Sequence, residues 1–214
     1  MSLADENLLL VEGTKDLFAI QALMQAHVPW SKDRKQWPAR LEDMKGVEEL
    51  LKAGAISARL KTPGLSILGV ILDADKSAAS RYQKVRHRCA ELFPNLPETM
   101  PPEGLITDNG EKCFGLWIMP DNVADGDLET FLKFLVPGEN APLWKLATES
   151  VDRAIATGAA CKGHETKAGL YTWLAWQKDP GQSPGLALTA KVLDPTSSSA
   201  TPFVTWFKSL YQLQ

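Results

Sequence analysis

The chain has 214 residues, 44% hydrophobic and 23% charged, a globular composition that excludes disordered, collagen-like and coiled-coil proteins. A formal net charge of −3 excludes a global field that attracts nucleic acid, so any polyanion must be held locally. Cys89, Cys113 and Cys161 form no C-x-x-C pair, which argues against a disulfide framework and a zinc site and favours a reducing cytoplasm. Without a basic leader or an apolar run near the roughly 18 residues that a membrane span needs, we expect neither secretion nor membrane insertion.

The first elements are predicted from apolar spacing. Residues 7–12 are a short apolar run that Gly13 ends, and helix-like apolar spacing follows, which predicts a strand, a tight turn and a helix. A second strand is predicted at 40–44 and one continuous helix at 47–60.

The central part of the chain alternates strand and helix patterns. Residues 67–72 are an unbroken apolar run, typical of a strand covered on both faces in a parallel sheet. A helix is predicted at 77–93. Two further strands, at 104–107 and 113–119, flank a hairpin signal, Asp-Asn-Gly.

The remainder has helical spacing only, beginning at Leu128 and continuing from about Pro142 to the end of the chain. The predicted class is therefore α/β, a mainly parallel sheet flanked by helices with a helical C-terminal extension. We expect an α/β domain at 1–138 and a helical region at 139–214 packed on it. Aromatic residues at helical spacing are usually core, so Trp173 and Trp206 are interpreted as packing residues rather than base-stacking platforms.

Acidic residues follow two of the predicted strands. Glu12 ends the first strand, and Asp73 with Asp75 ends the strand at 67–72. Ligands bind beyond the carboxyl ends of strands in open parallel sheets, so these side chains are expected at one edge. Asp75 points the same way as Asp73 if extended geometry persists. Oxygen ligands suit Mg²⁺ or Mn²⁺, which is the predicted cofactor.

These motifs carry a resemblance to a known family. The sequence Leu-Val-Glu-Gly ending at Gly13 and the sequence Ile-Leu-Asp-Ala-Asp ending at Asp75 resemble the Toprim signature of topoisomerases, primases and related nucleases. The resemblance covers residues 7 to about 138 and implies a Toprim-like fold and metal-dependent phosphoryl transfer. The whole chain is most similar to a small family of uncharacterised Toprim-related bacterial proteins.

A closer resemblance concerns the site residues. The sequence from Glu12 to Asp16 is similar to the first motif of the overcoming-lysogenization-defect nucleases, in which acidic residues four apart serve the metal site. Asp127-Leu-Glu129 resembles their third acidic motif. The resemblance implies a general acid or base role for Glu12 and charge stabilisation by Lys167.

Together these inferences define the predicted site. The predicted catalytic residues are Glu12, Asp73, Asp75 and Lys167. The predicted metal ligands are Glu12, Asp16, Asp73, Asp75, Asp121, Asp127 and Glu129, the last three as candidates for a second ion. Asp127 and Glu129 also have a structural interpretation, since acidic residues favour the first turn of a helix. A basic helix face after Asp75, formed by Arg81, Lys84, Arg86 and Arg88, is either a solvated surface or a contact for phosphates.

Three functions remain open at this point. The favoured one is a metal-dependent nuclease acting on nucleic acid. The second is a non-catalytic Toprim-like binding module that works with nucleic acid or a partner protein such as an ATPase. The third is a haloacid-dehalogenase-like phosphatase, which uses an Asp-x-Asp motif but places it on the first strand. The oligomeric state, the substrate polarity and the number of metal ions stay undetermined.

Overall fold

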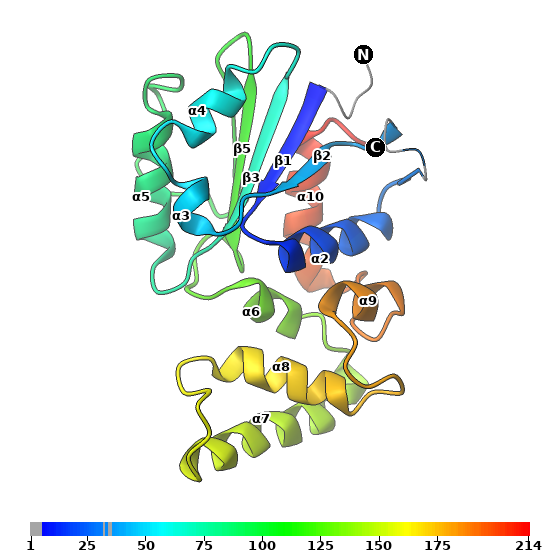
Figure 1. The fold of residues 1–214 in the computed structure, drawn as a ribbon. Helices are drawn as coiled ribbons and strands as arrows, with labels where there is room; N and C mark the ends of the chain where they lie inside the picture. Colours follow the sequence, from blue (N-terminus) through cyan, green and yellow to red (C-terminus); the bar gives the residue numbers. More distant parts are fainter. Residues whose placement is uncertain (1–5, 32, 34–35) are drawn as a thin grey trace.

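The computed structural model describes residues 6–31, 33 and 36–214, and its centre is a sheet (Figure 1). In the described part, the sheet has five strands in the order β2-β1-β3-β5-β4. The strands are β1 (Asn7–Val11), β2 (Arg40–Asp43), β3 (Ile67–Asp73), β4 (Leu105–Asp108) and β5 (Cys113–Met119). All neighbours are parallel except β4, which pairs antiparallel with β5. The predicted mainly parallel sheet and the predicted β4–β5 hairpin are confirmed.

Helices cover both faces of this sheet. They are α2 (Thr14–Gln25), α3 (Val47–Leu50), α4 (Ala55–Leu60), α5 (Ala78–Cys89), α6 (Leu128–Lys133), α7 (Ala141–Ala156), α8 (Glu165–Ala175), α9 (Pro184–Thr189) and α10 (Thr201–Leu210), with 3-10 turns η2 (Gly138–Asn140) and η3 (Ser198–Ala200). One apolar cluster joins α3, α4 and α5 to one face of the sheet. A second cluster joins α2 and α10 to the opposite face and continues through α6, α7, α8 and α9, of which α7 and α8 lie beyond the end of the sheet (Figure 1). Strands β1 and β3 are apolar because helices bury both of their faces, and the predicted α/β class is confirmed.

Two predicted helix boundaries were wrong. The single helix expected at 47–60 is divided into α3 and α4, because Gly54 at the N-cap of α4 takes a left-handed φ of 82° that interrupts the helix. The helix expected at 77–93 ends at Cys89, and a turn then brings the Phe93 N–H to the Cys89 carbonyl at 2.9 Å. Both differences lie at ends of helices that otherwise have the expected apolar face.

Two glycines seat the last helix against the sheet. Gly69 on β3 and Gly115 on β5 are register partners. A Cβ at Gly69 would lie 2.4 Å from the Tyr211 hydroxyl, and one at Gly115 would lie 2.4 Å from Leu210 Cδ2. The glycines therefore leave the space that α10 and its end fill. Tyr211 donates its hydroxyl hydrogen to the carbonyl of Leu8 at 2.9 Å, which ties the end of the chain to its first strand.

The C-terminal helices share their core with the sheet. Trp173 and Trp206 are 0% and 2% exposed, so their predicted packing role is confirmed. The division at residue 138 stays a prediction, because one apolar cluster runs through both sides of it. Among the described residues, no helix has both the length and the apolar character that crossing a membrane demands.

Candidate functional site

Glu12 and Asp73 meet at the carboxyl edge of the sheet. Glu12 directly follows β1 and Asp73 is the last residue of β3, and these two strands are parallel neighbours. Glu12 Oε1 accepts the backbone N–H of Asp73 at 2.8 Å. The structure thus brings together two carboxyl groups that lie far apart in the sequence.

Asp73 is held between the sheet and α6. Its Oδ1 accepts the backbone N–H of Leu128, the first residue of α6, at 2.9 Å. Burial, followed by the negative charges of Glu12, Asp16, Asp127 and Glu129, raises the pKa of Asp73 to about 9.

Glu12 and Asp16 have the same kind of environment. Burial is the main cause that raises the pKa of Glu12 to about 7, against the Asp73 N–H and the charge of Arg81, which lower it. Burial also raises the pKa of Asp16, in the first turn of α2, to about 6. Glu129 adds to that rise and Lys167 opposes it. Burial and mutual repulsion at the carboxyl edge therefore favour the protonated forms of Glu12, Asp16 and Asp73.

Lys167 reaches this cluster from the C-terminal region. Its Nζ lies 2.7 Å from Glu129 Oε1, and the side chains are 41% and 6% exposed respectively. Partial burial alone would lower the pKa of Lys167, but the hydrogen bond and charge of Glu129 raise it. Lys167 lies on α8, so a residue suggested by a weak motif does lie beside the acidic edge.

Asp127 has a clear structural role. It is the N-cap of α6, where its Oδ1 accepts the N–H and the hydroxyl hydrogen of Thr130, both at 2.8 Å. With the Thr130 side chain accepting the Asp127 N–H, this forms a capping box. The interpretation of Asp127 as a residue that stabilises a helix start therefore accounts for its position, and its charge still acts on Asp73.

The geometry expected for Asp75 was wrong. Asp75 has a left-handed φ of 52°, so the extended backbone of β3 does not continue through it. The cause is backbone pairing with Gly126, whose carbonyl accepts the Asp75 N–H at 2.7 Å. The Asp75 carboxylate forms an ion pair with Arg81, which also donates from Nε to the Asp73 carbonyl at 3.0 Å.

Asp121 lies apart from the cluster. It is exposed, and its Oδ1 accepts the N–H groups of Val123 and Ala124 at 3.1 and 2.7 Å. Its charge is absent from those that shift the pKa of Glu12, Asp16 or Asp73.

The donor set suits a hard cation, although it does not form a closed cage. In the portion of the chain that the structure describes, no three Asp, Glu, His or Cys side chains converge closely enough to hold a metal ion directly. Mg²⁺ usually retains several waters and takes only one or two protein carboxylates, so it does not need such a cage. The charges of Glu12 and Asp16 raise the pKa of Asp73, so added positive charge beside these three carboxyl groups would relieve their repulsion.

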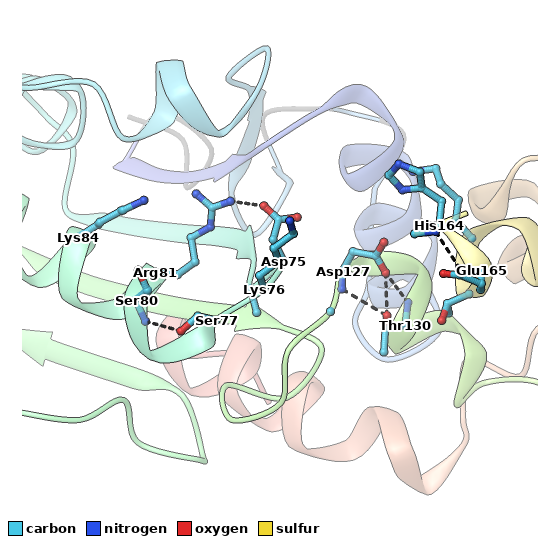
Figure 2. Close-up of a pocket in the computed structure, with 15 residues that line it drawn as sticks. Asp75, Lys76, Ser77, Ser80, Arg81, Lys84, Asp127, Thr130, His164 and Glu165 are labelled. Atoms are coloured by element: carbon cyan, nitrogen blue, oxygen red, sulfur yellow. Dashed lines mark hydrogen bonds and ion pairs between the residues drawn. The ribbon is translucent and has the colours of Figure 1, made fainter. Parts of the chain in front are cut away.

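A cavity of about 540 Å³ adjoins this edge (Figure 2). Figure 2 shows Lys84 and Arg81 at one side, His164 and Glu165 at the other, and Asp127 between them. Sequence reasoning missed several lining residues, namely Lys76, Ser77, Ser80, Thr130, Gly163, His164, Glu165 and Thr166. The sequence offered a partial signal, a lysine and two serines directly after Asp75, but no local pattern brings the start of α8 to α5.

The fold and the site define an α/β protein with an acidic carboxyl edge and a cavity beside it. A family model described as "Protein of unknown function (DUF3226)" matches residues 6–212, and the chain belongs to this family. No curated protein and no solved structure matches the chain.

Proposed function

We propose that the protein is a Toprim-like, divalent-metal-dependent phosphodiester hydrolase that acts on nucleic acid. The observation that supports it most is the meeting of Glu12 and Asp73 at the ends of adjacent parallel strands. Both motifs resemble the Toprim signature, and this resemblance implies metal-dependent phosphoryl transfer at the two carboxyl groups. Mg²⁺ or Mn²⁺ bound there would activate a water and neutralise charge on the leaving oxygen.

The chain's own residues have complementary roles in this proposal. Asp73 and Asp16 supply ligand oxygens, and Glu12, with a pKa near 7, can hold or release a proton at neutral pH. Lys167 places a positive charge at the rim of the cluster through its contact with Glu129. Asp75 faces the cavity, and Arg81 fixes it. Asp121 has no role in this version of the site.

The test combines a metal-binding and a cleavage measurement. The wild-type protein and the Asp73→Asn variant are incubated with single-stranded, duplex and nicked DNA in Mg²⁺ or Mn²⁺, and thermal unfolding is followed with and without the metal. We expect metal to stabilise the wild type by about 2.7 kcal/mol at 100 times Kd, and the variant much less. Cleavage should be lost in the variant. Equal stabilisation of both proteins, together with an absence of cleavage, would contradict the proposal.

One observation favours a non-catalytic binding module instead. Asp73 is engaged by the Leu128 N–H and Asp75 by Arg81, so both already have partners within the chain. Under this alternative the protein binds nucleic acid or a partner such as an ATPase, and the assay gives binding without cleavage. The phosphatase alternative predicts turnover of small phosphate esters with phosphate trapped on Asp73. Asp73 ends β3 rather than the first strand, which disfavours it.

A further inference from the structure

The cavity beside the acidic edge has a charge pattern of its own. Its cationic lining residues are Lys76, Arg81, Lys84 and Lys167, and its anionic ones are Asp75, Asp127 and Glu165. Every one of these anions already has a partner inside the chain. Asp75 pairs with Arg81, Asp127 caps α6, and Glu165 Oε1 accepts the Gly163 N–H at 2.8 Å.

Two of the cations have no such partner. Lys167 is paired with Glu129, whereas the side chains of Lys76 and Lys84 are exposed and make no ion pair or hydrogen bond with the described residues. Because the lining anions are occupied elsewhere, these two lysines give the cavity an uncompensated positive charge. This contrasts with the net charge of −3 of the whole chain.

The remaining lining groups suit phosphate oxygens. Ser77, Ser80 and Thr166 contribute hydroxyl-bearing side chains to the lining, and hydroxyls commonly contact the sugar-phosphate backbone. The Thr130 hydroxyl is already used in the capping box with Asp127. Two N–H groups in the first turn of α5 are already used, since Asp125 accepts the Ala78 N–H at 3.2 Å and Ser77 Oγ accepts the Ser80 N–H at 3.1 Å. The positive charge of the cavity therefore comes mainly from its lysine and arginine side chains.

The cavity has few groups that could stack on bases, namely the His164 ring and the Arg81 guanidinium. Among the described residues that line it, none is a phenylalanine, tyrosine or tryptophan. Binding of single strands through bases depends on aromatic platforms, whereas contacts to phosphates are independent of sequence.

We infer that this cavity holds the phosphate backbone of a nucleic-acid strand, with Lys76 and Lys84 contacting phosphates next to the one at the acidic edge. The inference rests on the proposed function, because the acidic edge is the place where one phosphodiester reacts and the cavity binds the neighbouring phosphates. It also assigns a role to the start of α8, since His164, Thr166 and Lys167 close the cavity opposite α5. The C-terminal helices thus form one wall of the binding site.

The experiment measures binding without cleavage. Fluorescence anisotropy of labelled mixed-sequence oligonucleotides, single-stranded and duplex, is recorded in EDTA from about 50 to 200 mM salt. The proteins are the wild type, the double variant Lys76→Gln/Lys84→Gln and a matched control, Lys61→Gln/Lys178→Gln. The control removes the same two charges at exposed positions outside the cavity. Circular dichroism checks that all three are folded.

We expect the cavity variant to lose about two phosphate contacts. The slope of log affinity against log salt should become shallower by about 1.4 on single strands and about 1.8 on duplex, while the control keeps the wild-type slope. Equal slopes in the cavity variant and the control, or no binding by the wild type, would overturn the inference. A mononucleotide that displaces the oligonucleotide at equal phosphate concentration would assign the cavity to small phosphate esters and also overturn it. Salt-dependent binding through these lysines without any cleavage in Mg²⁺ would support the inference while the proposed reaction fails.

Discussion

Asp73 is a proposed metal ligand whose buried position is unfavourable for a carboxylate in the folded protein. Its carboxyl is largely buried, surrounded by other acids, and yet it anchors α6 by accepting the Leu128 N–H. A neutral amide could accept that hydrogen bond without the cost of keeping a carboxyl group protonated at neutral pH. A residue that destabilises the protein at neutral pH and that an isostere could replace is a candidate for function.

The first prediction follows from the raised pKa of Asp73. In the folded protein this pKa is about 9, against an ordinary 3.8, so the folded state holds a proton that the unfolded state has lost between these values. The free energy of unfolding should therefore fall as the pH rises from about 4 to about 9, and Glu12 and Asp16 act in the same direction. Asp73→Asn should be more stable than the wild type at pH 8, on the order of 1–3 kcal/mol.

Urea unfolding at about pH 5.5 and about pH 8 measures this effect. The variant should show a flatter pH dependence than the wild type, with the difference concentrated at the higher pH. Asp121→Asn is the matched control, because Asp121 is exposed and lies outside the cluster. Equal destabilisation of Asp73→Asn at both pH values would contradict the pKa assignment.

The second prediction concerns the pair of Lys167 and Glu129. Glu129 is 6% exposed, so Lys167→Gln leaves a buried carboxylate without its cation. Because Lys167 is 41% exposed, solvent screens the pair, and we expect a loss of only about 1–2 kcal/mol. A double-mutant cycle with Glu129→Gln measures the coupling. If the double variant is as unstable as the sum of the single variants, the two side chains do not stabilise each other.

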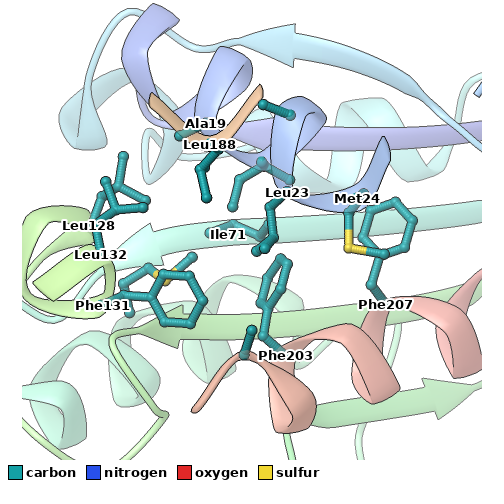
Figure 3. Packing of buried hydrophobic residues seen from close by; sticks show 14 of the residues in the cluster. Ala19, Leu23, Met24, Ile71, Leu128, Phe131, Leu132, Leu188, Phe203 and Phe207 are labelled. Carbon is teal, nitrogen blue, oxygen red and sulfur yellow. The ribbon is translucent and has the colours of Figure 1, made fainter. Parts of the chain in front are cut away.

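At the scale of elements, α10 packs so closely on the sheet that little space is left for added side-chain atoms between them. Figure 3 shows Phe203 and Phe207 of this helix facing Ile71 of β3 and Met24 of α2. Their rings belong to one apolar cluster in which both phenylalanines are 0% exposed. Such close approach depends on Gly69 and Gly115, where a side chain would collide with Tyr211 or Leu210.

The third prediction tests the contact between α10 and the sheet. Gly115→Ala places a methyl group 2.4 Å from Leu210 Cδ2, so the buried Leu210 side chain or α10 itself must shift, and we expect a loss of about 1–3 kcal/mol. Gly138→Ala is the control, since nothing lies within 4 Å of the added Cβ there. The control should change stability by less than about 0.5 kcal/mol in chemical denaturation. A neutral Gly115→Ala would mean that α10 packs more loosely than the structure shows.

The elements predicted correctly from the sequence are those in which nearly every residue is buried. Strands β1, β3 and β5 are buried on both faces, so their composition alone reveals them. The division of the helix at 47–60 was missed because Leu50, Ile56 and Leu60 keep an apolar face on both sides of Gly54. Periodicity reports which side chains are buried, and it does not report where the backbone breaks.

At the scale of the whole molecule, the C-terminal helices complete the core that the sheet begins. Four large side chains of α10, Phe203, Trp206, Phe207 and Leu210, are each at most 2% exposed. Burial of such a side chain contributes roughly 1.5–3 kcal/mol, so together they contribute on the order of 10 kcal/mol. That is comparable with the whole stability of a typical protein.

The fourth prediction is that a fragment of residues 1–138 does not fold by itself. Without the later helices, one face of the sheet loses the apolar cover of α10, while α2 and α6 lose their contacts with α9 and α8. Calorimetry or thermal circular dichroism should show no cooperative unfolding transition for the fragment, whereas the full chain unfolds cooperatively. A cooperative transition in the fragment would instead support an independent domain ending near residue 138.

Only part of the candidate site could be predicted from the sequence, because the rest depends on contacts between distant segments. Glu12 and Asp73 were identified because each comes at the end of an apolar run that predicts a strand. The pattern within each short segment was therefore enough to place both residues at the carboxyl edge of the sheet. The turn at Asp75 depends on Gly126, and the cavity depends on the start of α8 lying opposite α5. Such long-range contacts leave no periodic trace in a single sequence.

The hydrogen bond from Tyr211 to Leu8 has a consequence for how the molecule is made. During translation β1 leaves the ribosome well before α10, the helix that packs on this side of the sheet. Until then one apolar face of the nascent sheet stays uncovered, and chaperones can bind it. Only after α10 has been synthesised can Tyr211 reach Leu8 and close the structure.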